Sequence, residues 1–388
     1  MFHSRAIFRI LVCIMLVLIV FSSSTEQKAE AHAYSASYTK LDFTKASIEM
    51  TYALDELSVI ELTNGDSNNN GILELEEFNA VKDQFLVLLK NDIKLEINKE
   101  AQNWTVESFT INREGDTAKA ILKVAFPPTL ASQTVSLTDN LYVKDKVTAN
   151  YVDLVTINYG EKTSTSALSG NYRVWSMQMS DHIYDALRQD PQSQSNSNED
   201  ASGSEQISGW FSFFKLGMTH ILEGYDHLLF LFSLLIARQT FKQYATMITA
   251  FTIAHSITLS LTVLGFINVP GWFVEPAIAL SICYVAVENI VRKKVSYRWV
   301  LTFLFGLIHG MGFADILSEM DIPRSELATD LISFNLGIET IQVTLVAILL
   351  LPLVLLHRWK FSRRAVISGS AIAFILGAYW LVSRVFFN

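Results

Sequence analysis

Cysteine is almost absent from this chain of 388 residues, which has two of them, Cys13 and Cys283. The first lies in an apolar leader and the second inside a later apolar run, so the long stretch between them contains no thiol. A disulfide framework is therefore excluded for any domain in that stretch, which must be stabilised by its core and by any metal that it binds. We interpret Cys283 as a packing residue and not as a metal ligand.

Apolar residues, by contrast, are abundant and unevenly placed. They make up 50% of the chain, and the mean hydropathy is positive, which a soluble protein of this length rarely shows. Before residue 208 the sequence is mixed and polar, whereas beyond it long apolar runs alternate with short charged loops. This pattern predicts a water-exposed N-terminal part and a membrane-embedded C-terminal part.

The first residues have the order of a secretory signal peptide. Arg5 and Arg9 precede the apolar run Ile10–Phe21, which is too short to span a bilayer, and two overlapping A-x-A cleavage sites follow within 29–33. We predict a cleaved signal peptide over residues 1–31, with an uncleaved anchor as the alternative. The expected location is a bacterial cytoplasmic membrane, with the N-terminal domain outside the cytoplasm.

Residues 32–189 are predicted to form this exported domain, and the domain is expected to be β-rich. Apolar and polar residues alternate there with a period of two, which is typical of half-buried strands and favours a small sandwich. The alternating segments are Ile48–Leu54, Ile93–Ile97, Ala120–Val124 and Val147–Ile157. A polar tract of low complexity, residues 190–207, follows and is predicted to be a flexible linker.

One stretch of the exported domain, residues 66–77, fits the calcium-binding loop of an EF-hand. The predicted ligands are the side chains of Asp66, Asn68, Asn70 and Glu77 and the carbonyl oxygen of Ile72, with Gly71 at the sharp turn. Oxygen ligands in this number suit calcium and bind soft metals poorly. We expect a structural calcium ion here, and an Asx-rich surface turn is the alternative interpretation.

The C-terminal part, residues 208–388, is predicted to be a helical membrane domain. About six apolar runs are long enough to span a bilayer, at 209–236, 243–266, 273–291, 299–318, 327–356 and 365–387. Basic residues gather in the loops after the first, third and fifth runs, and such loops are typically cytoplasmic. The C-terminus is then expected outside the cytoplasm, on the same side as the exported domain.

Ionisable and amide side chains interrupt these runs, although each one costs free energy at membrane depth. At about 1.5 Å per helical residue, several of them on different helices reach the bilayer midplane, where they can meet. We predict a metal site with the ligands His220, Asp226, His227, His255, His309 and Glu339, and a secondary polar site with Glu223, Glu288, Asp315, Asn335 and Gln342. The alternative is that single members, such as His255 or Glu288, only pack or make hydrogen bonds.

The spacing of the residues adds three expectations about the helices. Offsets of three and seven place His220, Glu223 and His227 on one face of the first helix. The glycines are expected at helix contacts, namely Gly306, Gly310, Gly312 and Gly337. The last run contains one buried ionisable residue, Arg384 near its outer end, so this helix is expected to pack outside the site.

The polar residues lie in five motifs, which occur in the order of a known family. They are G-M-T-H-I-L-E-G-Y-D-H-L-L-F-L-F (217–232), A-F-T-I-A-H-S-I-T-L (250–259), V-E-P-A-I-A-L-S-I (274–282), F-G-L-I-H-G-M-G-F-A (305–314) and F-N-L-G-I-E (334–339). Through them the chain resembles the HupE/UreJ family, in its larger branch with an exported N-terminal domain. The resemblance implies a hydrogenase or urease accessory protein of the nickel or cobalt permease kind, with His220 and Asp226-His227 as its first-helix motif.

Two functions remain open from the sequence. Imidazole suits borderline ions such as nickel or cobalt, so a divalent-metal permease is the preferred interpretation, and the exported domain could capture metal or a partner for it. The alternative is an intramembrane zinc-dependent hydrolase, in which histidines hold zinc and an acidic side chain activates water against a lipid or peptide bond. The expected partners are the lipid bilayer and a metal ion, not nucleic acid, and a homo-oligomer or an accessory protein is left open.

Overall fold

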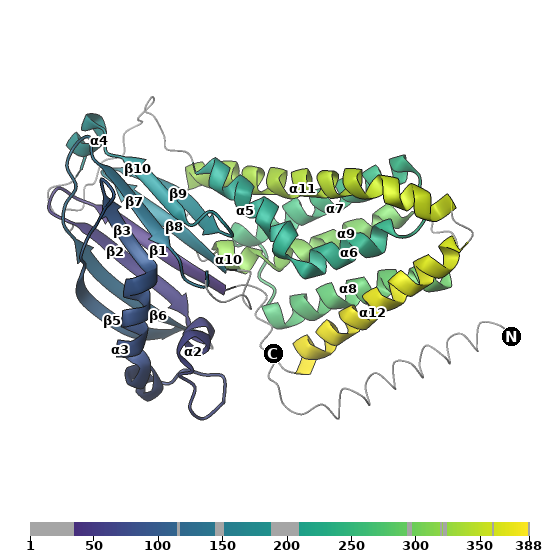
Figure 1. Cartoon of the computed structure of the whole chain (residues 1–388), viewed down its shortest axis with the longest axis horizontal. Coiled ribbons are helices and arrows are strands. Elements are labelled where there is room, and N and C mark those ends of the chain that lie inside the picture. Colours follow the sequence, from purple (N-terminus) through teal and green to yellow (C-terminus); the bar gives the residue numbers. More distant parts are fainter. Residues whose placement is uncertain are drawn as a thin grey trace.

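The computed structural model describes residues 35–114, 117–143, 151–187, 209–292, 297–318, 320, 324–358 and 361–386. The predicted signal peptide and the predicted linker lie outside these residues. The described chain forms a β-rich domain, residues 35–187, and a helical domain, residues 209–386, which lie end to end in Figure 1. The expected order of a β-rich part followed by apolar helices is confirmed.

The β-rich domain contains two sheets among its described residues. The larger sheet has the order β5-β6-β2-β1-β8-β9, in which β1 and β8 are parallel and the other neighbours antiparallel. Its strands are β1 (Ser35–Phe43), β2 (Ile48–Asp55), β5 (Thr105–Glu114), β6 (Thr117–Phe126), β8 (Tyr151–Tyr159) and β9 (Lys162–Ser169). The smaller sheet has the order β10-β7-β3-β4, with β3 (Ile93–Ile97), β4 (Glu100–Ala101), β7 (Thr134–Asp139) and β10 (Val174–Gln178).

The period-two alternation explains these strands and the core that they share. Every second residue of β2, beginning with Ile48, is buried, while the residues between are only partly buried. Buried side chains of both sheets form one apolar cluster, which includes Tyr52 and Leu137. Three of the alternating segments lie within β2, β3 and β6, and the fourth overlaps β8, with residues 147–150 outside the described part.

Three helices of the β-rich domain were not expected from the alternation. They are α2 (Glu56–Thr63), α3 (Leu75–Asp92) and α4 (Asp181–Asp185). Helix α3 begins with a capping box in which Glu74 and Glu77 each accept a hydrogen bond from the other's backbone N–H. It buries Phe78, Phe85 and Leu89 against the core of the sheets, so its apolar face follows a helical spacing.

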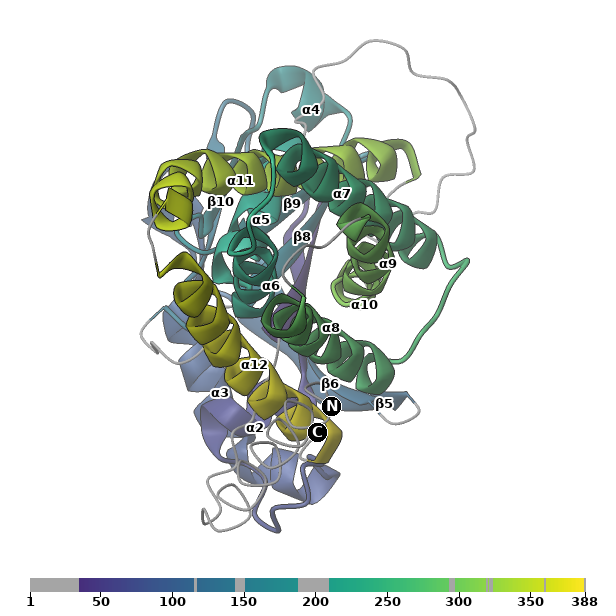
Figure 2. The ribbon, with the colours of Figure 1, turned by 90° about the vertical axis from the view of Figure 1, so that its right-hand side faces the viewer.

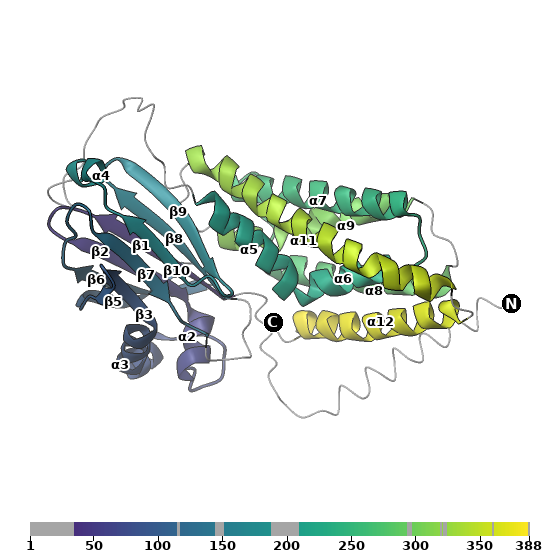
Figure 3. The ribbon, with the colours of Figure 1, turned by 45° about the horizontal axis from the view of Figure 1, so that its top comes forward.

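The helical domain contains eight helices among its described residues. They are α5 (Trp210–Glu223), α6 (Tyr225–Leu235), α7 (Phe241–Val263), α8 (Gly271–Val291), α9 (Arg298–Met311), α10 (Ala314–Ser318), α11 (Arg324–Arg358) and α12 (Ser362–Phe386). Four segments are long and apolar enough to cross a membrane, at Phe241–Val263, Gly271–Val291, Glu326–Arg358 and Ser362–Phe386. Figure 3 shows the helices running lengthwise away from the sheets, and Figure 2 shows α6 in their midst.

Two of the six predicted runs are not single helices. The first, 209–236, is divided into α5 and α6 at Gly224, and the fourth, 299–318, into α9 and α10 after Met311. The expectation of one continuous first helix is therefore wrong. Gly224 has a ψ of 88°, which is not helical, and glycine at such a position permits a close approach of neighbouring groups.

The outer face of the larger sheet packs directly on the helical domain. Strand β8 is buried almost throughout, because its two faces have different neighbours. Its inward residues join the core of the β-rich domain, whereas Val152 and Leu154 join an apolar cluster with Phe213 and Leu216 of α5. The two domains therefore share an interface with an apolar cluster, which lies one helix turn from the first predicted metal ligand, His220.

Candidate metal centre

The break between α5 and α6 brings two histidine rings into edge-to-face contact. His220 lies in the last turn of α5 and His227 in the first turn of α6, and their ring centroids are 4.6 Å apart. A Cβ atom at Gly224 would lie 2.6 Å from the carbonyl oxygen of His220 and 2.8 Å from Nδ1 of His227. The chain can therefore turn this closely only because residue 224 has no side chain.

Two further histidines reach the same place from α7 and α9. The ring of His255 is centred 6.0 Å from that of His220, and the ring of His309 is centred 5.2 Å from that of His227. All four imidazoles are buried. Gly310 permits the close crossing of α9 and α7, because a Cβ atom there would collide with the backbone of His255. The structure therefore brings the rings of these four histidines close together.

Hydrogen bonds at Nδ1 orient two of these imidazole rings, those of His227 and His309. Oδ1 of Asp226 lies 2.9 Å from Nδ1 of His227, and the carbonyl oxygen of Phe305 lies 2.8 Å from Nδ1 of His309. Because a carbonyl oxygen or a carboxylate accepts, each Nδ1 donates and the Nε2 atom keeps its lone pair. Among the described residues, neither Nε2 atom has a hydrogen-bond partner although both are buried, and such an atom costs about 1–3 kcal/mol unless something binds it.

Three of the rings could share one ion after a small adjustment. One ring nitrogen from each of His220, His227 and His255 lies within 4.8 Å of the other two. With metal–nitrogen bonds of about 2.0–2.1 Å, tetrahedral ligands stand about 3.3 Å apart, so small side-chain rotations would complete the site. Neutral imidazole nitrogen is a ligand that zinc, nickel and copper accept. The donor set therefore fits a borderline divalent ion, and Asp226 would be an orienting group.

The last helix reaches this centre, which the sequence did not lead us to expect. Arg384 of α12 has a side chain that is 9% exposed; its guanidinium lies 3.7 Å from Oδ2 of Asp226 and 3.6 Å from Oε2 of Glu275. The prediction that this helix packs outside the site is therefore wrong. The guanidinium balances negative charge beside His227, and the isolated position of Arg384 in an apolar run was the only sequence signal for this role.

Aromatic rings enclose the histidines and were also missed. Phe313 and Phe334 stack with centroids 5.1 Å apart and planes 3° apart, and both lie against His220, at 4.5 and 5.4 Å between centroids. Phe251 and Phe230 lie on the other side, 5.2 and 4.9 Å from His309. These walls exclude water from the imidazoles and strengthen any charge interaction there.

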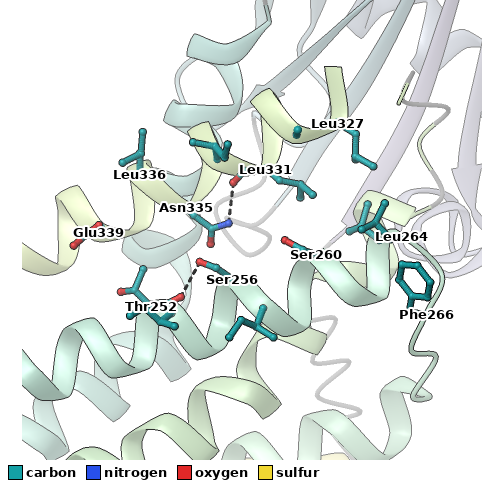
Figure 4. Close-up of a pocket in the computed structure, with 15 residues that line it drawn as sticks. Thr252, Ser256, Ser260, Leu264, Phe266, Leu327, Leu331, Asn335, Leu336 and Glu339 are labelled. Carbon is teal, nitrogen blue, oxygen red and sulfur yellow. Dashed lines mark hydrogen bonds between the residues drawn. The ribbon is translucent and has the colours of Figure 1, made fainter. Parts of the chain in front are cut away.

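Glu339 lies in a groove between α7 and α11 and not among the three converging ring nitrogens. The groove has a volume of about 970 Å³. It is lined by apolar side chains and by the polar side chains of Thr252, Ser256, Ser260, Asn335 and Glu339 (Figure 4). Asn335 donates to the carbonyl oxygen of Leu331. At the inner end, Thr252 donates to Oε1 of Gln342, at 3.0 Å, and Gln342 also lines a small pocket with His227. Gln342 therefore lies between the groove and the small, mainly apolar pocket beside His227.

The other residues of the secondary polar site are dispersed. Glu288 is buried in ion pairs with Arg298 and Arg292, each at 3.1 Å, which is a packing role. Glu223 is half-buried and faces the turn after β9, where a Cβ atom at Gly170 would lie 3.1 Å from its Oε1. The side chain of Asp315 lies outside the described part of the structure. The break at Gly224 separates His227, in α6, from the helix α5 that contains His220 and Glu223, so the three do not share one helical face as expected.

The predicted calcium loop lies between α2 and α3. Oδ2 of Asp66 accepts from the backbone N–H of Gly71 at 2.8 Å, and Oδ1 of Asn70 accepts from that of Ile72 at 2.8 Å. Gly71 has a φ of +79°, a conformation that glycine adopts readily. Hydrogen bonds with Glu74 and Ser67 lower the pKa of Glu77 to about 2, so that this carboxyl is ionised at neutral pH.

Comparison with known proteins identifies the helical half of the chain. A search of curated proteins finds no match. Residues 195–384 match the family model described as HupE / UreJ protein. This segment contains the four histidines, Asp226 and the polar groove, in agreement with the resemblance of the five motifs. Through this segment, the chain belongs to the HupE/UreJ family.

Proposed function

We propose that the helical domain binds a divalent transition-metal ion of the nickel or cobalt class within the membrane and transports it or hands it on. The observation that supports this most is the convergence of one ring nitrogen each from His220, His227 and His255 to within 4.8 Å of one another. Family membership points to the same class of ion. The Nε2 atoms of His227 and His309 are buried without a hydrogen-bond partner among the described residues. Such atoms are costly in an apolar core, and metal binding would compensate that cost.

Each residue has a distinct proposed part. His220, His227 and His255 bind the ion, and His309 accepts it as it leaves or completes the coordination. Asp226 orients His227 through their hydrogen bond of 2.9 Å, in the way that carboxylates orient metal-binding imidazoles. Arg384 lies beside Asp226 and does not itself bind the ion, because a guanidinium has no lone pair to offer a metal.

The groove between α7 and α11 is the proposed route of the ion. Its hydroxyl, amide and carboxylate oxygens could replace water molecules around a cation one by one, with Glu339 as the attracting charge. Thr252 and Gln342 would pass the ion from this groove to His227, since both lie at the junction. Oxygen ligands bind borderline ions more weakly than imidazole does, so the ion would move toward the histidines.

The membrane arrangement belongs to the same proposal. Basic loops after the first, third and fifth apolar runs favour six crossings, with the β-rich domain and the C-terminus outside the cytoplasm. In this arrangement α5 with α6, and α9 with α10, each count as one interrupted crossing. Interrupted helices are tolerated in membranes where their free backbone groups line a site buried in protein.

Uptake of radioactive nickel tests the transport function. Cells that express the protein should accumulate more nickel at limiting concentration than cells without it, and His220→Ala should abolish the difference. The variant His182→Ala is a matched control, because His182 is exposed in the β-rich domain. Equal uptake with and without the protein would contradict transport, and tightly bound stoichiometric zinc in the purified protein would favour the zinc-dependent hydrolase instead.

We further propose that residues 66–77 bind calcium as a structural ion. The supporting observation is that this loop joins two helices, as in an EF-hand, with Gly71 at the turn and Glu77 in the first turn of the second helix. Calorimetric titration of the full-length protein with calcium should give one binding event that Glu77→Gln removes. Glu76→Gln is the control, because Glu76 is exposed; no heat from the unaltered protein would contradict the site.

A further inference from the structure

A continuous chain of oxygen atoms lies in the core of the β-rich domain, remote in sequence from the histidines. Oδ1 of Asp153 lies 2.8 Å from Oγ1 of Thr39 and 2.9 Å from Oγ of Ser37. Oγ of Ser37 lies 2.6 Å from the hydroxyl of Tyr151. That hydroxyl in turn lies 2.5 Å from Oδ2 of Asp139 and 2.7 Å from the hydroxyl of Tyr52.

All of these side chains are buried between the two sheets. Ser37, Tyr52, Tyr151 and Asp153 belong to the larger sheet, and Asp139 ends β7 of the smaller one. Asp139 and Asp153 are both 0% exposed. Two carboxyl groups therefore share a core that is closed to bulk solvent, and a buried carboxylate without compensation is very costly.

The hydroxyl groups of this chain have fewer protons than its close oxygen–oxygen contacts require. Besides the contact of Thr39, which supplies its own proton, the chain contains four close contacts, namely Asp153–Ser37, Ser37–Tyr151, Tyr151–Asp139 and Tyr151–Tyr52. Each hydroxyl has one proton to donate, so Ser37, Tyr52 and Tyr151 supply three. If both carboxyls were ionised, one contact would consist of two oxygen lone pairs facing each other. A fourth proton is therefore required.

The hydrogen bonds of the two carboxyl groups, Asp139 and Asp153, indicate which of them holds the fourth proton. Asp139 accepts from Tyr151 and from the backbone N–H of Leu141, at 2.8 Å, as an ionised carboxylate does. Oδ2 of Asp153, in contrast, has no hydrogen-bond partner among the described residues although it is buried. Burying an oxygen atom without a hydrogen bond costs far less free energy in a neutral carboxylic acid than in a carboxylate.

We infer that Asp153 is protonated at neutral pH and that the core of the β-rich domain is a proton-binding site. In this state Asp153 donates to Ser37, Ser37 and Tyr52 donate to Tyr151, and Tyr151 donates to Asp139. Each of the four contacts then has one proton. The negative charge of Asp139 is balanced by Arg173, whose guanidinium lies over the ring of Tyr151 at 4.9 Å.

The charged groups around the site agree with this assignment. Burial raises the pKa of Asp139 to about 6, and burial together with the negative charge of Asp139 raises the pKa of Asp153 well above its usual range. Arg173 lowers both. Tyr52, Tyr151 and Tyr142 also face the site, and burial raises the pKa of each, so all three stay neutral.

The site is coupled to the helical domain through β8 and the turn after β9. Val152 and Leu154, the neighbours of Asp153, pack on α5. Nε of Arg173 donates to the carbonyl oxygen of Gly170 at 2.9 Å, and Gly170 lies against Thr219 and Glu223 of the same helix. The proton site therefore lies directly beside the contact of β8 with α5. Loss of the proton would add a second negative charge that Arg173 alone cannot balance.

Infrared spectroscopy of the full-length protein at neutral pH tests the inference. A buried neutral carboxylic acid has a C=O stretching band at higher frequency than a carboxylate, and Asp153→Asn should remove one such band. Asp185→Asn should leave it in place, because Asp185 is exposed. If Asp153→Asn does not fold, a pH titration of the same band in the unaltered protein gives the answer.

The infrared experiment has three distinguishable results. A neutral-acid band that persists above neutral pH and disappears in Asp153→Asn supports the inference. A band that disappears in Asp139→Asn but persists in Asp153→Asn would place the proton on the other carboxyl and overturn the assignment. The absence of any such band at neutral pH in the unaltered protein would overturn the proton site altogether. None of these results depends on metal binding, so the proposed function is tested separately.

Discussion

Nδ1 of His227 lies 2.9 Å from Oδ1 of Asp226, the residue that directly precedes it. The same oxygen also accepts from the backbone N–H of His227, at 2.8 Å. This arrangement holds the imidazole at the start of α6, and a single glycine at residue 224 permits it. The orientation of His227 is therefore set before any ion arrives.

Asp226→Asn should weaken metal binding without removing it. The amide that replaces the carboxylate is neutral and orients the His227 ring less firmly, and loss of such a second partner typically costs about 10–100-fold in affinity. Equilibrium nickel binding to the purified variant measures the change. Asp185→Asn is the matched control, and an affinity equal to that of the unaltered protein would show that Asp226 has no orienting role.

Glu339→Gln should slow nickel uptake while leaving equilibrium binding at the histidines within about twofold. The reason is that Glu339 lies in the groove and not among the three converging ring nitrogens, so it affects how the ion arrives. Initial uptake rates and binding isotherms of the same variant make the comparison, with Glu107→Gln, an exposed residue of β5, as control. A large loss of affinity with this variant would instead place Glu339 among the ligands.

The β-rich domain should become less stable as the pH rises. In the unfolded chain an aspartate titrates with a pKa of about 3.9, whereas burial raises the pKa of Asp139 to about 6 and raises the pKa of Asp153 well above its usual range. The native state therefore binds more protons than the unfolded state, so the free energy of unfolding falls as the pH rises from about 4 through 6 and beyond. Calorimetric unfolding across this range should show a decreasing Tm, with a flatter profile for Asp153→Asn. A Tm that rises with pH throughout would contradict this sign.

The sequence predicted the parts of this molecule that depend on repeated patterns. Period-two alternation gave β2 and β3, apolar runs gave the long helices, and helical depth predicted that His220, His255 and His309 would meet. These features rest on many residues at once, so single exceptions do not obscure them.

The missed features each depend on one or two residues or on tertiary contact. The break at Gly224 depends on a single residue without a side chain. An isolated glycine in an apolar run is not enough to predict the end of a helix. The role of Arg384 depends on where α12 packs, and the position of Glu339 depends on the rotation of α11. The capping box of Glu74 and Glu77 was a local sequence signal for the start of helix α3. The helix was not predicted, because these two residues were interpreted as part of the calcium loop.

The most direct test of the histidine centre is equilibrium binding of nickel to the purified full-length protein, compared with His220→Ala and His182→Ala. One site per chain in the unaltered protein and in His182→Ala, with no such site in His220→Ala, is the result that the converging imidazoles predict. Unchanged binding in His220→Ala, or none in the unaltered protein, would contradict a metal site at this centre.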